Sequence, residues 1–256
     1  MQATLTVLGS GTSGGVPSLG CACAVCTSTD PRDQRLRPSL LITLGSRQVV
    51  IDTPPDFRTQ ALRAGLHTVD AVFYTHGHAD HILGMDDVRP FSFRRTEPIP
   101  LYGDARTIAD LRRVFNYVFS DQTTESAVPR VTAQVLEQPV EVAGVQFEPL
   151  TVMHGRLPIV GYRFGNVAYL TDVSAIPPAT MERLQHLDVL FLDALRHRPH
   201  PTHFTVAQSL DVVAALRPRQ TYFIHICHDL GHASTEAALP AHVRLAYDGM
   251  QVEVDL

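Results

Sequence analysis

The feature that most constrains this chain is a six-residue segment rich in metal-binding side chains. It reads His76-Gly77-His78-Ala79-Asp80-His81 and directly follows the apolar run 71–74. A short β-branched and aromatic run before a glycine predicts a buried strand that ends in a turn. Imidazole and carboxylate groups suit zinc, manganese and iron. Four such groups on one tight turn cannot all reach a single ion with tetrahedral geometry. We therefore expect two ions, with His76 and His78 on one and Asp80 and His81 on the other.

Three further candidate ligands each stand at the end of a strand-like segment. His154 ends the alternating run 145–153, Asp172 follows the apolar run 167–171, and His225 follows 221–224. Taken singly, each also fits a structural role: a turn residue, a helix N-cap and a core histidine, respectively. Their repeated position after a strand favours a shared site.

The pattern H-x-H-x-D-H, followed in order by His154, Asp172 and His225, resembles the metallo-β-lactamase superfamily. The resemblance implies an α/β fold, a four-layer αβ/βα sandwich with the metals along one edge of the paired sheets. It implies that Asp172 bridges two ions held roughly 3.5–4 Å apart. Asp52, at the end of the run 48–51, matches an aspartate that accepts an imidazole N–H and fixes the tautomer of that ligand.

Length and composition fit a single globular domain over residues 1–256. No apolar stretch approaches the ~20 residues of a membrane span, and the N-terminus reads as a first strand without a leader, so we expect a cytoplasmic protein. The net charge of −5 argues against a nucleic-acid substrate, because phosphate backbones require a basic surface. The expected partner is a small phosphorylated metabolite, with a homodimer left open.

All 21 of the Lys and Arg residues are arginine. Lysine Schiff-base and lysine general-base chemistry are therefore excluded. Any group that clamps a phosphate must be arginine, whose planar fork suits phosphate oxygens.

Strand-like and helical patterns alternate along the whole chain, without a linker or repeat. Strands are expected over 3–8, 39–44, 48–52, 70–75, 145–153, 159–164, 167–171, 188–193, 220–225 and 251–255. Helices are expected over 56–64, 104–118, 177–186, 205–216 and 234–242. Asp104 is the expected N-cap of the second helix, and Pro177 and Pro178 fit the start of the third.

Three of the four cysteines lie together in Cys21-Ala22-Cys23-Ala24-Val25-Cys26. In a cytoplasmic chain this spacing indicates metal binding rather than disulfides. A closed structural zinc site needs a fourth ligand. Cys227 and His228 are both candidates from the sequence, and a cluster of free thiols without metal is the plain alternative.

The cysteine cluster, after a glycine-rich first turn at 9–17, resembles the phosphodiesterase family that accompanies the bacterial carbon–phosphorus lyase pathway. That resemblance favours His228 as the fourth zinc ligand. It assigns His203 and Asp80 as catalytic residues, with His203 as general acid or phosphate-binding group, although His197 and His200 lie in the same segment. Arg89, just beyond the metal motif, is the candidate for substrate contact.

The resemblance implies a dinuclear phosphodiesterase that hydrolyses small, cyclic, sugar-linked phosphodiesters. Two divalent ions (Zn, Mn or Fe) would lower the pKa of a bound water from about 16 toward about 7 and so supply hydroxide for the attack. One structural zinc would complete the metal content. Thioesterases, lactonases and tRNA 3′-processing ribonucleases of the superfamily share the ligands and remain alternatives. A non-catalytic binding relative is a further alternative, although its metal motif is degraded and the one here is complete.

Overall fold

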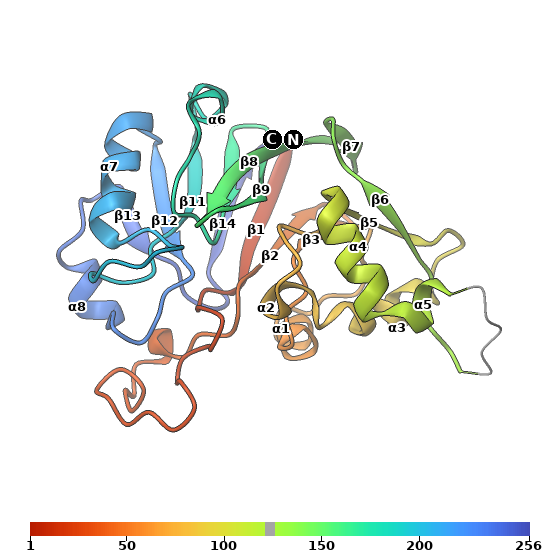
Figure 1. Ribbon diagram of the computed structural model, residues 1–256, viewed down its shortest axis with the longest axis horizontal. Helices are drawn as coiled ribbons and strands as arrows, with labels where there is room; N and C mark the ends of the chain where they lie inside the picture. Colours follow the sequence, from red (N-terminus) through yellow and green to blue (C-terminus); the bar gives the residue numbers. More distant parts are fainter. Residues whose placement is uncertain (121–125) are drawn as a thin grey trace.

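Apolar strand segments in both halves of the chain build two mixed sheets (Figure 1). The computed structural model describes residues 1–120 and 126–256. The first sheet has the strand order β14-β1-β2-β3-β4-β5-β6. Its strands are β1 (Gln2–Gly9), β2 (Ser39–Leu44), β3 (Arg47–Ile51), β4 (Ala71–Phe73), β5 (Ile99–Gly103), β6 (Val131–Val135) and β14 (Gln251–Asp255).

The second sheet has the order β13-β12-β11-β10-β9-β8-β7. Its strands are β7 (Val140–Val142), β8 (Val145–His154), β9 (Leu157–Phe164), β10 (Val167–Leu170), β11 (Val189–Asp193), β12 (Gln220–Ile224) and β13 (Val243–Leu245). β3 to β6 run parallel in the first sheet, and β10 to β13 run parallel in the second. Residues that follow parallel strands meet at the carboxyl edge of a sheet, where α/β folds place their ligands.

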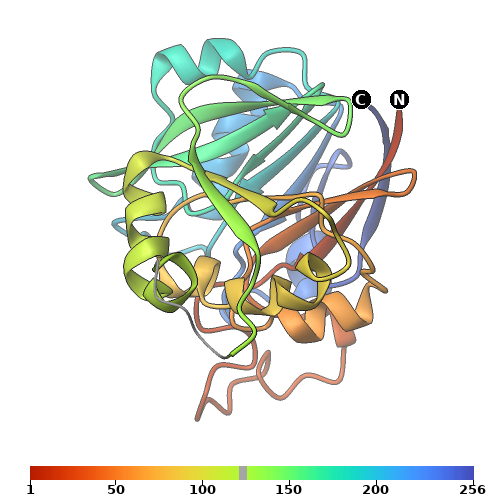
Figure 2. The same ribbon diagram turned by 90° about the vertical axis from the view of Figure 1, so that its right-hand side faces the viewer.

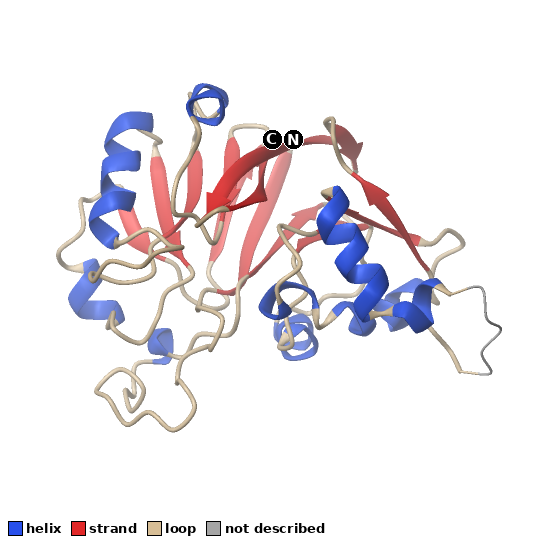
Figure 3. Ribbon diagram, in the orientation of Figure 1, coloured by secondary structure: helices blue, strands red, loops and turns tan. Residues whose placement is uncertain are grey.

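Helices lie on the outer sides of the paired sheets (Figure 3). The α-helices are α1 (Phe57–Arg63), α2 (Ala79–Ile82), α3 (Arg89–Ser92), α4 (Ala105–Val114), α5 (Asn116–Phe119), α6 (Pro178–Arg183), α7 (Val206–Leu216) and α8 (His232–Glu236). Two 3₁₀ turns, η1 (Pro31–Asp33) and η2 (Met85–Val88), complete the described helical elements. None of the described helices is long and apolar enough to cross a membrane.

Three apolar clusters separate these layers. One contains residues of both sheets, such as Phe73 of β4, which stacks on Phe147 of β8 with ring centroids 4.3 Å apart. A second joins the second sheet to α6 and α7, and a third joins the first sheet to α1 and α4. Helix, sheet, sheet and helix therefore follow one another, and the predicted four-layer αβ/βα sandwich is confirmed. The single domain over 1–256 and the cytoplasmic location stay predictions.

Several details of the predicted elements need correction. The helix expected over 104–118 is two helices, because the chain leaves helical geometry at Phe115. Asp104 is its N-cap as predicted, accepting a hydrogen bond from the Thr107 N–H at 2.7 Å. The helix expected over 234–242 is the shorter α8. Four strands, β5, β6, β7 and β13, were not predicted.

Candidate metal centre and active site

The candidate ligands converge because they stand at or just after the carboxyl ends of β4 in the first sheet and of β8, β10 and β12 in the second. The His76–His81 segment follows β4, His154 is the last residue of β8, and His225 follows β12. Asp52, Asp172 and His225 have left-handed backbones, with φ of 61°, 59° and 58°. This conformation costs a non-glycine residue on the order of 1–3 kcal/mol and persists where the surrounding structure imposes it, often at functional sites.

One donor group consists of His76, His78 and His154, whose ligand atoms lie within 4.8 Å of one another. His76 Nε2 is 2.9 Å from His78 Nδ1. The His154 Nδ1–H donates to the carbonyl of Thr202 at 2.8 Å. This bond leaves the lone pair of His154 Nε2 available to a metal ion, as is usual for a metal-binding histidine.

The second donor group consists of Asp80, His81, Asp172 and His225, all buried, again with ligand atoms within 4.8 Å. Asp172 Oδ1 is 3.2 Å from His81 Nε2, and its Oδ2 is 3.3 Å from His225 Nε2. The same Oδ2 is 4.0 Å from Nε2 of His76 in the first group. Asp172 thus lies between the two groups, where a bridging carboxylate is expected.

Several atoms of this centre are buried without a hydrogen-bond partner among the described residues. They are Asp80 Oδ2, His81 Nε2, and both ring nitrogens of His225. Buried polar atoms are nearly always satisfied, so such a concentration indicates a missing partner. Burial opposes ionisation of Asp172, yet the imidazoles of His225 and His81 outweigh it and hold its pKa well below the usual value. Anionic oxygens beside free imidazole nitrogens fit two divalent ions. The individual ligand assignments stay predictions.

Asp52 lies behind the second group. Its Oδ2 accepts hydrogen bonds from His81 Nδ1–H at 2.7 Å and from the Thr75 hydroxyl at 2.8 Å, and its Oδ1 accepts one from the Thr75 N–H. The His81 ring is therefore oriented with Nε2 toward Asp80 and Asp172. This contact is the one expected of a residue that fixes a ligand's tautomer.

His203 reaches the same centre from the loop before α7. Its ring stacks on His225 with centroids 4.6 Å apart, and its ligand atom lies within 4.8 Å of those of His154 and Asp172. Of its neighbours, His200 accepts a hydrogen bond from the Thr202 N–H, and His197 lines a cavity beside Cys23 and His228.

Asp193, which the sequence analysis missed, holds His203 in place. This fully buried last residue of β11 accepts the Nδ1–H of His203 at 2.7 Å and the Val173 N–H at 2.7 Å. Burial raises the pKa of Asp193, although the bond from His203 acts against it. The signal for this residue was its position, since a carboxylate ends the strand between two ligand-bearing strands.

Arg89, the predicted substrate contact, is engaged on the surface. Its Nη2 is 3.4 Å from Asp86 Oδ2, and its Nη1 donates to the Ala127 carbonyl at 3.2 Å. Contact between Arg89 and a substrate stays a prediction.

The cysteine cluster forms a separate donor group. Cys21, Cys23, Cys26 and His228 have ligand atoms within 4.8 Å of one another, with His228 Nδ1 at 3.3 Å from Cys21 Sγ and 3.4 Å from Cys23 Sγ. Cys227 is buried elsewhere, and its sulfur accepts the Asp229 N–H. Three thiols and one imidazole suit a closed zinc site.

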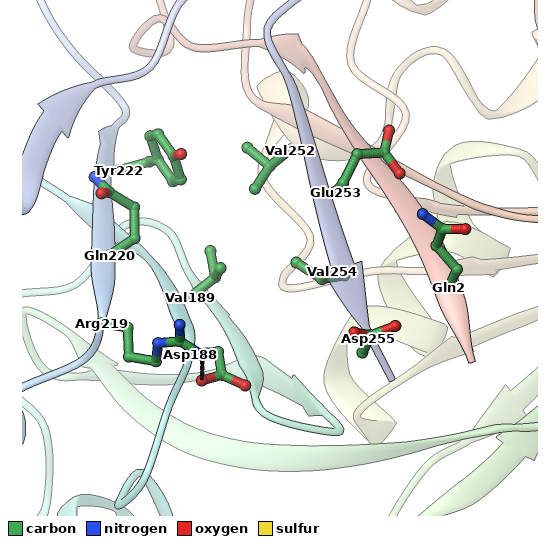
Figure 4. Close-up of a pocket in the computed structure, with 10 residues that line it drawn as sticks. All are labelled: Gln2, Asp188, Val189, Arg219, Gln220, Tyr222, Val252, Glu253, Val254 and Asp255. Carbon is green, nitrogen blue, oxygen red and sulfur yellow. Dashed lines mark hydrogen bonds and ion pairs between the residues drawn. The ribbon is translucent and has the colours of Figure 1, made fainter.

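A cavity of about 520 Å³ lies at the amino-terminal ends of β11 and β12, opposite the ends that carry the candidate metal donors (Figure 4). It is lined by residues at the start of β11, β12 and β1 and at the end of β14. The charged side chains on one of its sides, Arg219 and Asp188, form an ion pair at 3.3 Å. It contains none of the candidate metal donors.

Comparison with known proteins agrees with this geometry. Residues 47–226 match the family model described as the Beta-lactamase superfamily domain. A solved structure described as a new diphosphatase from the PhnP family is 52% identical, with a TM-score of 0.94 over 99% of this chain and 98% of that one. Zinc-bound PqqB from Methylobacterium extorquens shares the fold, at 21% identity and a TM-score of 0.77, over 99% of this chain and 100% of that one.

Among curated relatives, an octanoyltransferase from Porphyromonas gingivalis is 39% identical over 97% of this chain but only 51% of its own length. The chain thus spans about half the length of the curated relatives it matches. The shared domain and the donor groups support a metal-dependent hydrolase. With the family model covering most of the chain and the 52% identical structure covering nearly all of it, the chain belongs to the β-lactamase superfamily, within its PhnP family.

Proposed function

We propose that the protein is a dinuclear metal-dependent phosphodiesterase that acts on small phosphorylated metabolites, including cyclic, sugar-linked phosphodiesters. The observation that carries the proposal is the pair of adjoining donor groups, with Asp172 between them. His76, His78 and His154 would hold one ion and Asp80, His81 and His225 the other. Two such ions supply an activated water near neutral pH and neutralise charge on the phosphoryl oxygens.

The protein's own residues would orient the substrate and move the proton. His203 stands beside both groups, with Nδ1–H fixed by Asp193, so its Nε2 is the atom that can give a proton to the leaving oxygen. The buried carboxylate of Asp193 fixes the tautomer and the orientation of this ring. A positioned acid of this kind contributes typically ~10²–10⁴-fold to the rate.

Hydrolysis of bis-p-nitrophenyl phosphate by protein loaded with zinc or manganese tests the proposal. We expect turnover that a chelator removes and that either metal restores. A fully metal-loaded protein that releases no p-nitrophenolate would contradict it.

A second candidate is hydrolysis of a diphosphate linkage, which the 52% identical diphosphatase favours. The chemistry at phosphorus is the same, and only the leaving group differs. Comparing a cyclic phosphodiester with a nucleoside diphosphate sugar at equal concentration separates the two.

A third candidate is acyl chemistry, suggested by the relative described as an octanoyltransferase. Because this chain covers only half of that protein, the name can belong to the other half. Incubation with an octanoyl thioester tests it directly, and we expect no cleavage above the rate of the metal-free protein.

A further inference from the structure

The outer edge of β14 is an open strand edge. β14 stands at the end of the first sheet and pairs with β1 in antiparallel register. Leu256 and Met1 exchange backbone hydrogen bonds, and in an antiparallel pair such residues alternate with residues whose N–H and C=O groups point the other way. The backbone groups of Gln251, Glu253 and Asp255 therefore point away from β1, and none of them has a partner within residues 1–120 and 126–256. An edge of this kind is a template for a further strand.

The cavity of about 520 Å³ adjoins this open edge (Figure 4). Its apolar surface comes from Val252 and Val254 of β14 and from Val189 and Tyr222 of the second sheet. Tyr222 stacks on the buried ring of Phe191 with centroids 5.5 Å apart, yet it is only partly buried itself. The first sheet thus ends before it covers the inner face of the second sheet. A strand added to β14 would lie over this uncovered strip.

The two faces of β14 differ in chemistry. Val252 and Val254 pack against the apolar cluster between the sheets, whereas the alternate residues Glu253 and Asp255 are exposed. Figure 4 shows Val252 pointing toward Tyr222 and Glu253 pointing away from it. Glu253 accepts a hydrogen bond from a threonine hydroxyl of β1 at 2.8 Å, and neither carboxylate pairs with a cationic side chain in the part of the chain that the structure describes.

This alternation specifies the side chains of an added strand. Residues directly opposite each other on neighbouring strands share a face, and opposite charges there attract. An added strand would therefore carry basic side chains opposite Glu253 and Asp255 and apolar side chains opposite Val252 and Val254. The β14 of a second copy of this chain fits less well, because it would place the same acids against each other.

We propose that the outer edge of β14 binds an extended segment of a partner protein, in which apolar and basic side chains alternate, as an additional strand of the first sheet. The open backbone groups of β14 supply the hydrogen bonds, and Val189 and Tyr222 receive the apolar side chains, as in other cases of strand addition. The two carboxylates select the basic side chains. This edge lies at the amino-terminal ends of β11 and β12, away from the metal donors, so the proposal does not depend on the proposed function.

Fluorescence anisotropy with a labelled, end-capped peptide Arg-Val-Lys-Val-Arg-Val-Lys tests the proposal. One comparison peptide has glutamate in place of each basic residue, and another has the same residues in an apolar block and a basic block. We expect the alternating basic peptide to bind at least about tenfold more tightly than either of them. Equal binding of the alternating and the block peptide would overturn the proposal, because charge alone would then be recognised. Absence of binding of the alternating peptide to the wild type would also overturn it.

Variants of Glu253 separate the backbone from the charge. Glu253→Gln loses the charge and keeps the N–H, whereas Glu253→Pro loses both and leaves the bonds to β1 intact, and edge strands tolerate proline. Glu253→Pro should bind the alternating peptide about tenfold more weakly than Glu253→Gln. Thermal unfolding by circular dichroism shows whether both variants are folded.

Charge reversal gives a second measurement that does not depend on tolerance of proline. Glu253→Lys should raise the Kd of the alternating basic peptide about tenfold, and Glu141→Lys, an exposed glutamate on the edge strand β7 of the second sheet, should leave it unchanged. A Kd that is the same in the wild type and all Glu253 variants would overturn the proposal. Dimers of the peptide-free protein in sedimentation velocity that Glu253→Pro abolishes would assign the edge to a second copy and would overturn it as well.

Discussion

At the scale of single residues, Asp172 meets two constraints at once. Its carboxylate lies between the two donor groups, and its backbone adopts the left-handed conformation. Asp172→Ala should lower turnover of bis-p-nitrophenyl phosphate by about a thousandfold or more and reduce the bound metal. Two cations about 4 Å apart repel strongly without a shared anion. Turnover and metal content by mass spectrometry measure the effect.

Asp172→Asn is the matched variant, since asparagine tolerates a left-handed backbone better than alanine. It should keep the melting temperature closer to the wild type and still lose activity. Two tightly bound metals with near-normal turnover in Asp172→Asn would show that the bridging assignment is wrong.

The pair His203 and Asp193 leads to a prediction about leaving groups. His203→Ala should depress kcat on an alkyl phosphodiester ~10²–10⁴-fold and on a p-nitrophenyl ester far less, because an alkoxide needs a proton and p-nitrophenolate does not. Asp193→Asn should produce the same contrast more weakly and shift the pH profile. Equal losses on both esters would assign His203 to phosphate binding, and loss of metal would make it a ligand.

The cysteines should differ in reactivity once zinc is removed. A backbone hydrogen bond from Cys26 and the neighbouring His228 lower the pKa of Cys23 to about 6, whereas burial raises that of Cys26 to about 11. Only the thiolate is alkylated, so at pH 7 iodoacetamide should modify Cys23 well before Cys26. Below pH 6 the reaction at Cys23 should slow as its thiolate is protonated. Peptide mass spectrometry gives both rates. Zinc-loaded protein, the control, should be protected, and equal modification of the two thiols without zinc would contradict the prediction.

At the scale of elements, one arginine fixes the cysteine-bearing segment to the segment of His228. The Arg35 side chain is fully buried, pairs with Asp33 at 2.9 Å and donates to the carbonyls of Cys227 and Leu230. Arg35→Met should lower the free energy of unfolding by about 3–5 kcal/mol, because it leaves the buried carboxylate of Asp33 without its cation and removes the donor to the carbonyls of Arg32, Cys227 and Leu230. Urea denaturation measures this loss.

Arg32→Met is the control for that experiment. Arg32 forms a partly exposed ion pair with Asp30 at 2.7 Å, and such pairs contribute about 0–1 kcal/mol. Zinc release to a colorimetric chelator should be faster in Arg35→Met than in Arg32→Met. Similar stability and release in the two variants would make Arg35 an ordinary core residue.

The elements that carry the candidate ligands were predictable, because each ligand follows a short apolar strand with a clear pattern. β5 was missed since Pro100 and Gly103 interrupt a five-residue segment, and β6 since its alternation is weak and mostly exposed. The contact of Asp193 with His203 joins two segments ten residues apart through an irregular loop, and no local pattern encodes it.

At the scale of the whole molecule, the candidate centre joins the two sheets. His76, His78, Asp80 and His81 follow β4 of the first sheet, whereas His154, Asp172 and His225 come from the second. Metal ions at this place would cross-link the halves, and their binding free energy would add to that of folding.

Removal of the metals should therefore lower the melting temperature. At a free metal concentration about 1,000 times Kd, binding adds about 4 kcal/mol, or roughly 8–16 °C for a chain of this size. Differential scanning calorimetry with and without chelator measures the shift. Asp172→Asn should show a smaller shift, and an equal shift in that variant would assign the effect to the cysteine site instead.

The two ends of the described chain lie side by side (Figure 2). Met1 and Leu256 are joined by backbone hydrogen bonds in both directions, next to the pairing of β1 with β14. A circular permutant that links residue 256 to residue 1 by a few glycines and opens at the exposed turn Gly45–Ser46 should therefore fold and keep its turnover. Because Met1 and Leu256 lie side by side and apart from the candidate metal donors, the order in which the strands follow one another along the chain can change while the site keeps its geometry.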